Sequence, residues 1–240
     1  MIDVDDLTVR FGGVTPLDGL SVRFDAGTCG LIGPNGAGKT TFFNVLSGFV
    51  RATRGSVLAD GVDLLRMPHF RRARWGLRRT FQTEQAIEEL SILDNVVLAW
   101  EHSGWAQRGR RRDDVLATLQ LVGLEVGADT RVGTLGARER RLVEVARALV
   151  GRPRVVLLDE PAAGLPDEET GHLGEVIRAI PEHRDALVIL VDHDMTLVSS
   201  CCEITAVLDF GKLVAVGPTD AVLRDERVIA AYLGTVEEVA

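Results

Sequence analysis

The sequence predicts an α/β fold in which a largely parallel sheet carries helices on both faces. Two unbroken apolar runs, at residues 155–158 and 186–191, are bounded by polar residues, as is typical of central parallel strands covered on both sides. Helical spacing around residues 169–180, between these runs, predicts a right-handed β-α-β unit. Alternating apolar residues near the N-terminus predict half-buried antiparallel strands beside that sheet.

The N-terminal strands are predicted from apolar residues that recur at every second position, namely Ile2, Val4, Leu7, Val9, Phe11, Leu20, Val22 and Phe24. Residues 30–32 predict a short strand that enters a glycine-rich loop. Residues 40–47 then predict a helix with Gly48 at its C-terminal cap. Residues 56–59 and the Asp60-Gly61 turn are typical of a hairpin.

The middle of the chain changes to helical periodicity. Ser91 and Asp94 resemble a capping box at the start of a helix. Two further helical patterns follow and stop at Gly123 and Gly151. We therefore expect residues 84–150 to form a helical insert.

Composition limits the possible classes of function. The 240 residues suit a single domain, with 1–83 and 151–240 forming the α/β core. A net charge of −8 argues against a general nucleic-acid-binding protein. No apolar run approaches the ~20 residues that span a bilayer, and the acidic start lacks a signal-peptide layout. Cys29, Cys201 and Cys202 fit neither a disulfide framework nor a metal site, so we expect buried thiols in a cytoplasmic protein.

A phosphate-binding loop is predicted at residues 33–40, which match the pattern G-x-x-x-x-G-K-[ST]. Glycines let backbone N–H groups turn inward around an anion, and the following helix adds its positive N-terminus. Lys39 would supply charge to the outer phosphates, and the Thr40 hydroxyl would ligate magnesium. A plain glycine-rich turn is the alternative, but a strand before and a helix after favour the phosphate site.

Carboxylates end both predicted parallel strands. Strand ends in an open α/β sheet face the ligand crevice, where Asp159 can hold magnesium through water and Glu160 can polarise an attacking water. His193, within Asp192-His193-Asp194, ends the neighbouring strand and can reach a γ-phosphate. Solvated strand ends and a surface histidine would give the same pattern, but the adjacent phosphate loop favours a nucleotide site.

The order and spacing of these motifs resemble those of the ABC ATPases over essentially the whole chain. Residues 33–41 (GPNGAGKTT) are similar to the Walker A motif, and residues 155–161 to Walker B with its catalytic glutamate. Gln82, in the segment RTFQ, matches the Q-loop glutamine, and His193 the switch histidine. The resemblance implies a P-loop ABC ATPase fold with a RecA-like mixed-sheet core, an N-terminal antiparallel β subdomain and an inserted α-helical subdomain.

The resemblance also implies that the ligands are ATP and Mg²⁺. Phe11 matches the A-loop aromatic that stacks on adenine, although a strand residue that fills the core would give the same pattern. The expected catalytic residues are Glu160, His193 and Gln82, and the expected magnesium ligands are Thr40, Gln82 and Asp159. The expected nucleotide-binding residues are Phe11, Gly33, Pro34, Asn35, Gly36, Ala37, Gly38, Lys39, Thr40 and Thr41.

Within the superfamily, several segments resemble the ATPase subunits of branched-chain amino acid importers, namely residues 11–13, 79–82, 161–165, 193–195 and 228–234. Related importers of urea, amides or other small solutes share these segments. The resemblance implies polytopic membrane permease subunits as partners, a periplasmic or extracellular solute-binding protein acting indirectly, and a place at the inner face of the membrane.

Two motifs depart from the family pattern. Counting back from the A-R-A-L segment places residues 135–139 at the L-S-G-G-Q signature, where Gly136 replaces the serine, Arg138 a glycine and Glu139 the glutamine. Glu139 would repel a phosphate, whereas the Arg138 guanidinium could replace the missing donors, and a misalignment is a third reading. Pro166 stands where the D-loop has Asp or Asn. We therefore expect a heterodimer with a second ATPase subunit whose signature is intact.

Two alternative functions remain at the level of the sequence, and the reading of one basic run stays open. A soluble, non-transport ABC ATPase would share the motifs but usually has two nucleotide domains or a coiled-coil insertion. A regulatory subunit with a degenerate signature would bind nucleotide without turnover, which the presence of Glu160 and His193 disfavours. Residues 108–112 form a dense basic run that is either a solvated loop or a contact with lipid headgroups or the membrane subunit.

Overall fold

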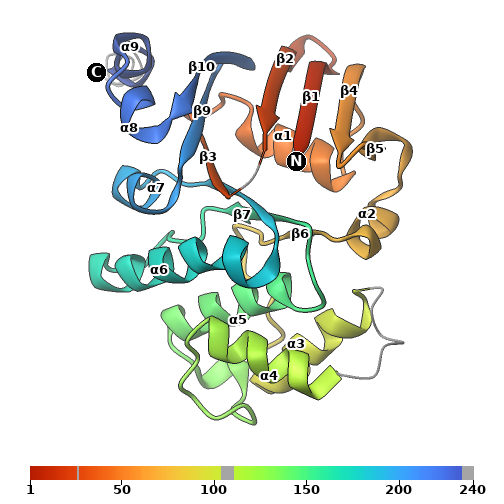
Figure 1. Cartoon of the computed structure of the whole chain (residues 1–240), viewed down its shortest axis with the longest axis vertical. Helices are drawn as coiled ribbons and strands as arrows, with labels where there is room; N and C mark the ends of the chain where they lie inside the picture. Colours follow the sequence, from red (N-terminus) through yellow and green to blue (C-terminus); the bar gives the residue numbers. More distant parts are fainter. Residues whose placement is uncertain (26, 104–110, 234–240) are drawn as a thin grey trace.

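A six-stranded mixed sheet forms the centre of the computed structural model, which describes residues 1–25, 27–103 and 111–233 (Figure 1). The strand order is β10-β9-β3-β8-β7-β6, and only the edge strand β10 runs antiparallel to its neighbour. The strands are β3 Thr28–Ile32, β6 Leu77–Arg79, β7 Val155–Asp159, β8 Leu187–Val191, β9 Ile204–Asp209 and β10 Lys212–Pro218. The predicted pair of central parallel strands, β7 and β8, is confirmed.

The two apolar cores lie on opposite faces of this sheet. Val155 and Leu157 of β7 pack into one cluster, whereas Val156 and Leu158 pack into the other. On the first face, α1 (Lys39–Ser47) lies between the sheet and the antiparallel N-terminal sheet. The second face is covered by α6 (Asp167–Arg184) and α7 (Met195–Cys201). Burial on both faces explains why the β7 and β8 sequences are unbroken apolar runs.

The N-terminal sheet is antiparallel, with the order β2-β1-β4-β5. Its strands are β1 Ile2–Phe11, β2 Val14–Phe24, β4 Arg54–Ala59 and β5 Val62–Asp63. A register shift between Val4 and Leu7, with Asp6 at a φ of 50°, lets both apolar residues face the core although they are three apart. Phe11 is 52% exposed, so the alternative that it fills the core is wrong.

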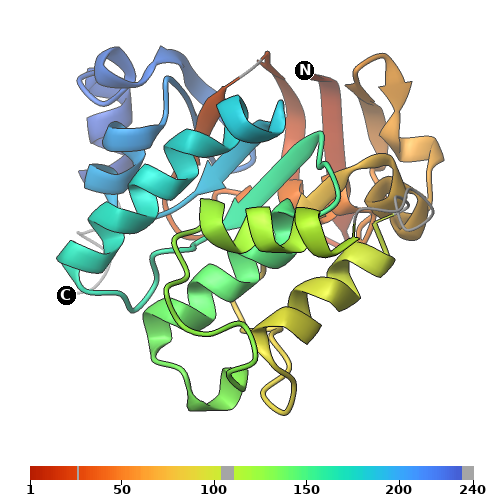
Figure 2. The ribbon, with the colours of Figure 1, turned by 60° about the horizontal axis from the view of Figure 1, so that its bottom comes forward.

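The helical segment lies below the sheet in Figure 1 and comes forward in Figure 2. It contains α3 (Ile92–Glu101), α4 (Arg111–Leu121) and α5 (Ala137–Leu149). Ser91 caps α3 as predicted, because its hydroxyl accepts the Asp94 N–H at 3.0 Å. The apolar core of these helices is continuous with the α6 face of the sheet.

The remaining elements connect these layers and complete the C-terminal end. They are the 3₁₀ helices η1 (Leu64–Arg66) and η2 (Val132–Thr134), and the helices α2 (His69–Trp75), α8 (Thr219–Val222) and α9 (Glu226–Leu233). In the part of the chain that the structure describes, every helix is too short or too polar to cross a bilayer. The three cysteines are buried and form no disulfide among the described residues, as expected. Residues 108–110 of the basic run lie outside the described residues, and Arg111 pairs with Glu101 at 2.9 Å.

Candidate nucleotide site

The glycine-rich loop connects β3 to α1, in the strand–loop–helix context that the motif requires. Gly33 and Gly38 have φ angles of 152° and 106°, which other residues rarely adopt. A Cβ atom at Gly33 would lie 2.1 Å from the Leu208 carbonyl oxygen, and one at Gly38 would lie 2.4 Å from that of Pro16. Backbone from β9 and β2 therefore packs directly against the loop, and glycine is required at both positions.

Lys39 is held inside this loop. Its side chain is buried, and Nζ donates to the carbonyl oxygens of Gly33 at 2.5 Å and Pro34 at 3.0 Å. Burial lowers the pKa of Lys39, and the carboxylates of Glu160 and Asp159 oppose that shift. The ammonium group is therefore fixed at the mouth of the loop, close to two acidic side chains from a different part of the sequence.

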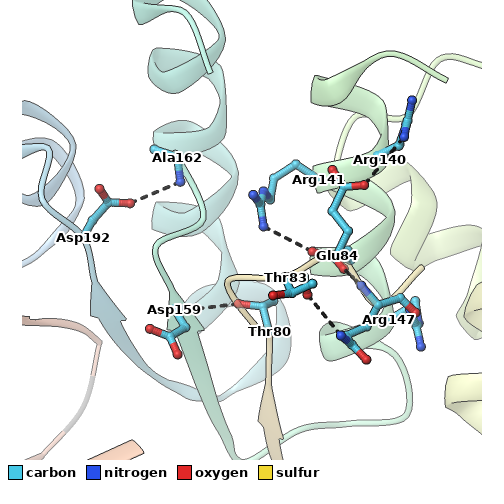
Figure 3. A network of polar contacts seen from close by, with 11 residues as sticks. Thr80, Thr83, Glu84, Arg140, Arg141, Arg147, Asp159, Ala162 and Asp192 are labelled. Atoms are coloured by element: carbon cyan, nitrogen blue, oxygen red, sulfur yellow. Dashed lines mark hydrogen bonds and ion pairs between the residues drawn. The ribbon is translucent and has the colours of Figure 1, made fainter. Parts of the chain in front are cut away.

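Asp159 ends β7 and is 1% exposed. Its Oδ2 pairs with the Arg79 guanidinium at 2.7 Å. Its backbone N–H donates to the Thr80 hydroxyl at 3.1 Å, as Figure 3 shows. Within the described part of the chain, Oδ1 is buried and has no hydrogen-bond partner. A carboxylate oxygen left free in this way is a suitable acceptor for magnesium or a magnesium-bound water, so the residues present fit the metal.

Glu160 and His193 meet at the carboxyl ends of two adjacent strands. The Oε1 atom of Glu160 lies 3.1 Å from Nε2 of His193. Glu160 has a φ of 48°, and its backbone N–H donates to the Val191 carbonyl at 2.7 Å. A non-glycine residue in this region is strained, and such residues cluster at functional sites. The two residues that the sequence placed at separate strand ends are thus in contact.

Asp192 fastens the segment that follows Glu160. Its Oδ2 accepts the backbone N–H of Ala162 at 3.1 Å, as Figure 3 shows. Burial raises the pKa of Asp192, and backbone hydrogen bonds to its carboxylate oppose that shift. Asp192 therefore fixes the geometry next to Glu160, a positioning role that its place in the acidic triplet did not reveal.

Three predicted residues make none of the contacts described above. Gln82 is exposed. Thr40 is exposed at the start of α1, and Phe11 lies at the end of β1 where the β1–β2 hairpin turns. Their roles stay predictions. The contact of Arg79 with Asp159 was not predicted from the sequence, although Arg79 begins the RTFQ segment.

The signature segment lies elsewhere, at the N-terminus of α5. Gly136 is the N-cap residue and supplies no capping side chain. The adjacent Arg138 and Glu139 side chains are 3.8 Å apart and partly exposed. Pro166 is the N-cap residue of α6. Neither helix start therefore presents a hydroxyl or amide side chain that could donate a hydrogen bond to a phosphate.

These features define a P-loop nucleotide-binding protein, and comparison with known families identifies the class. A family model described as "ABC transporter" matches residues 17–163, and one described as "Branched-chain amino acid ATP-binding cassette transporter" matches residues 212–238. The chain belongs to the ABC transporter ATP-binding family, and it is an ATPase of that family. Burial raises the pKa of Tyr232, in the C-terminal match, to about 12, and its hydroxyl interacts with the backbone of Gly33.

Similar proteins agree with this assignment. The chain is 34% identical to the high-affinity branched-chain amino acid transport ATP-binding protein BraF of Pseudomonas aeruginosa and 33% identical to LivG of Escherichia coli, each over 98% of both chains. It is 36% identical to the lipopolysaccharide export system ATP-binding protein LptB of Acidithiobacillus ferridurans, over 85% of this chain and 84% of that one. The ADP conformation of MJ1267, an ATP-binding cassette of an ABC transporter, superposes with a TM-score of 0.86 at 25% identity over 98% of both chains.

Proposed function

We propose that this chain is the ATP-hydrolysing subunit of an ABC importer for branched-chain amino acids or a related small polar solute. The contact between Glu160 and His193, next to the buried Lys39 and Asp159, is the observation that carries the proposal of hydrolysis. The C-terminal match at residues 212–238 and the similarity to BraF and LivG support an importer over an exporter such as LptB. Coupling to transport follows from the family.

In the proposed mechanism, the loop and α1 bind the phosphates through backbone N–H groups, with Lys39 adding a charge. Asp159, Thr40 and Gln82 would hold Mg²⁺, which neutralises charge on the outer phosphates. Glu160 would polarise the attacking water, and His193, which contacts Glu160, would reach the γ-phosphate. Thr41 and the loop residues 34–37 complete the phosphate contacts, and Phe11 stacks on adenine.

A polytopic membrane permease is the proposed partner that spans the bilayer. An exposed aromatic cluster supports this proposal: Phe49 is 59% exposed and Phe70 49% exposed. The Phe49 ring stacks on His69 with centroids 6.0 Å apart and lies 6.1 Å from Phe81, next to Gln82. Exposed apolar clusters of this kind mark protein contacts, and a permease bound there would touch the segment that carries Gln82.

The proposed assembly contains a second ATPase subunit and places this chain at the cytoplasmic face of the membrane. Gly136, Arg138, Glu139 and Pro166 weaken the surface that would complete another subunit's site, which favours a partner with an intact signature. A periplasmic or extracellular solute-binding protein would act through the permease. The acidic charge of the chain argues against a nucleic-acid partner.

The proposal is tested by purifying the tagged chain from its own cells with its bound partners. We expect a polytopic membrane protein to co-purify. The complex reconstituted in vesicles should take up radiolabelled leucine with ATP and not with ADP, or another small polar solute if leucine is not the cargo. A complex that contains no membrane protein, or one that contains ribosomes or DNA, would favour the non-transport alternative. Binding of ATP without phosphate release by the complex would favour the regulatory alternative.

A further inference from the structure

Arg79, the last residue of β6, occupies a buried position between three parts of the nucleotide site. Its side chain is 6% exposed. Nη2 donates to Oδ2 of Asp159 at 2.7 Å, and Nη1 donates to Oδ1 of Asn44, in α1, at 2.7 Å. The guanidinium carbon lies 5.4 Å from the centroid of the Phe43 ring and 5.0 Å from that of Phe81. Arg79 therefore touches the phosphate-loop helix, the acidic end of β7 and the segment that leads to Gln82.

These contacts hold the guanidinium on several sides at once. A planar guanidinium can donate in two directions while it stacks on aromatic rings, which a lysine ammonium cannot do. Asn44 and the two rings would keep Arg79 in place even if Asp159 turned away, so the position of the guanidinium does not depend on the ion pair alone.

The ion pair determines how Asp159 is presented. Arg79 occupies Oδ2 and the Thr80 hydroxyl receives the backbone N–H, so neither the carboxylate nor its backbone can rotate freely. Within the described residues only Oδ1 remains without a partner. A buried ion pair contributes little net stability because desolvation offsets the attraction. Its effect here is to orient one carboxylate oxygen.

We propose that Arg79 is a positioning residue for the magnesium site, holding Asp159 so that Oδ1 accepts the metal or its bound water. Removal of a residue that hydrogen-bonds to a metal ligand typically lowers metal affinity by about 10- to 100-fold. Because Phe81 packs on the same guanidinium, Arg79 also links the position of Asp159 to the segment that carries Gln82. This inference rests on the proposed role of Asp159 in binding magnesium.

The test measures how binding of ADP to the purified full chain depends on Mg²⁺. Calorimetry is carried out in EDTA and over a series of Mg²⁺ concentrations, on the wild type and on Arg79→Met. We expect the variant to need about 10- to 100-fold more Mg²⁺ for the same gain in ADP affinity. Its ADP affinity in EDTA should equal that of the wild type, since the contacts of Arg79 with α1 are at Phe43, Asn44 and Ser47, beyond the loop residues 33–40. An unchanged or lower Mg²⁺ requirement would overturn the inference.

Arg78→Met is the matched control. Arg78 lies next to Arg79 in β6 and is partly buried, but it donates to the carbonyl oxygens of Ala73 at 2.5 Å and Ser103 at 3.2 Å. Burial lowers the pKa of Arg78 to about 10. Loss of this arginine should lower the melting temperature and leave the Mg²⁺ dependence of ADP binding unchanged. An equal shift in both variants would mean that Arg79 acts through general stability alone.

Asp159→Asn separates this inference from the proposed function. If Asp159→Asn leaves the Mg²⁺ dependence unchanged, the proposed metal role of Asp159 is wrong. If Asp159→Asn shifts it and Arg79→Met does not, only the role of Arg79 is wrong. In the Asp159→Asn background, Arg79→Met should add no further shift. Should Arg79→Met fail to fold, Asn44→Ala removes one tether and keeps the charge, and a smaller rise in the same direction is expected; no rise would count against the inference.

Discussion

Two parts of the molecule are built differently. The first half comprises the phosphate loop with the ends of β7 and β8, and the second half is the start of α5, which aligns with the signature motif. In the first half, each polar side chain named at the site has a hydrogen-bond or ion-pair partner within 3.1 Å, namely Lys39, Asp159, Glu160 and Asp192. At the start of α5 the N-cap is a glycine, and the nearby charges pair loosely. In the proposed assembly, the first half would bind this chain's own nucleotide, and the second half would offer few hydrogen-bond donors to a nucleotide on another subunit.

The acidic side chain of Glu139, in the first turn of α5, affects both the helix and any anion at its N-terminus. A helix N-terminus attracts anions, and an acidic side chain in the first turn stabilises the helix itself. In the proposed assembly, the same Glu139 carboxylate would repel a phosphate of the other subunit's nucleotide at this helix start.

The two halves are nevertheless joined. The backbone N–H of Gln85 donates to Glu144 of α5, and Arg147 donates to the Gln85 carbonyl. Arg140 lies 3.7 Å from Glu84, and Figure 3 shows these contacts around one segment. Burial raises the pKa of Glu144. The segment that follows Gln82 is thus hydrogen-bonded to the helix whose start carries Gly136, Arg138 and Glu139.

The largest effect is expected from Glu160→Gln, which keeps the shape of the side chain and removes its basicity. Hydrolysis by the complex should fall by about 10²- to 10⁴-fold, the usual contribution of a general base, while ATP binding persists. Phosphate release and ATP binding are measured in parallel. Glu168→Gln, at an exposed acid in the first turn of α6, is the control and should leave both unchanged. Near-normal turnover in Glu160→Gln would assign the role to another residue.

Lys39→Ala should weaken ATP binding by about 10- to 100-fold, because a hydrogen bond to a charged group contributes roughly 1.5–3 kcal/mol. The chain has one other lysine, Lys212, which is exposed and pairs with Asp18 at 3.3 Å. Lys212→Ala is therefore a matched control that should bind ATP normally. Equal affinity in the two variants, measured by calorimetry, would remove Lys39 from the site.

Repair of the signature should narrow the difference between the two halves. A triple change, Gly136→Ser, Arg138→Gly and Glu139→Gln, restores the donors that the resemblance to the ABC ATPases implies. ATPase activity of the isolated chain should rise by about tenfold, since one restored hydrogen bond to a phosphate contributes roughly 1.5 kcal/mol. The same repair in a Glu160→Gln background should give no rise. If the triple change does not raise the ATPase activity of the isolated chain, residues 136–139 are not what limits that activity.

Phe11→Ala is expected to have the smallest effect. Loss of an aromatic surface for adenine should weaken ATP binding by about fivefold or more, since stacking on a base contributes roughly 1–3 kcal/mol. Val14, the cross-strand neighbour of Phe11, is 66% exposed, so Val14→Ala is the control. Equal affinities of Phe11→Ala and Val14→Ala would place adenine elsewhere.

The sequence predicted the fold and most of the strand-end residues because local patterns determine both. Unbroken apolar runs identified β7 and β8, and the polar residues after them had to emerge at one edge of the sheet. The contacts of Arg79 could not be predicted, because they join residues 35 and 80 positions apart. The register shift near Asp6 and the strained φ of Glu160 likewise depend on tertiary packing.

The central claim is that this chain contributes one competent half and one weak half to an asymmetric complex. It is tested most directly by the ATPase activity of the reconstituted complex, with the catalytic glutamate changed to glutamine in one subunit at a time. We expect Glu160→Gln in this chain to abolish most of the hydrolysis, and the equivalent change in the partner to remove little. Equal losses from the two changes, or brisk cooperative hydrolysis by this chain alone, would contradict the asymmetric account.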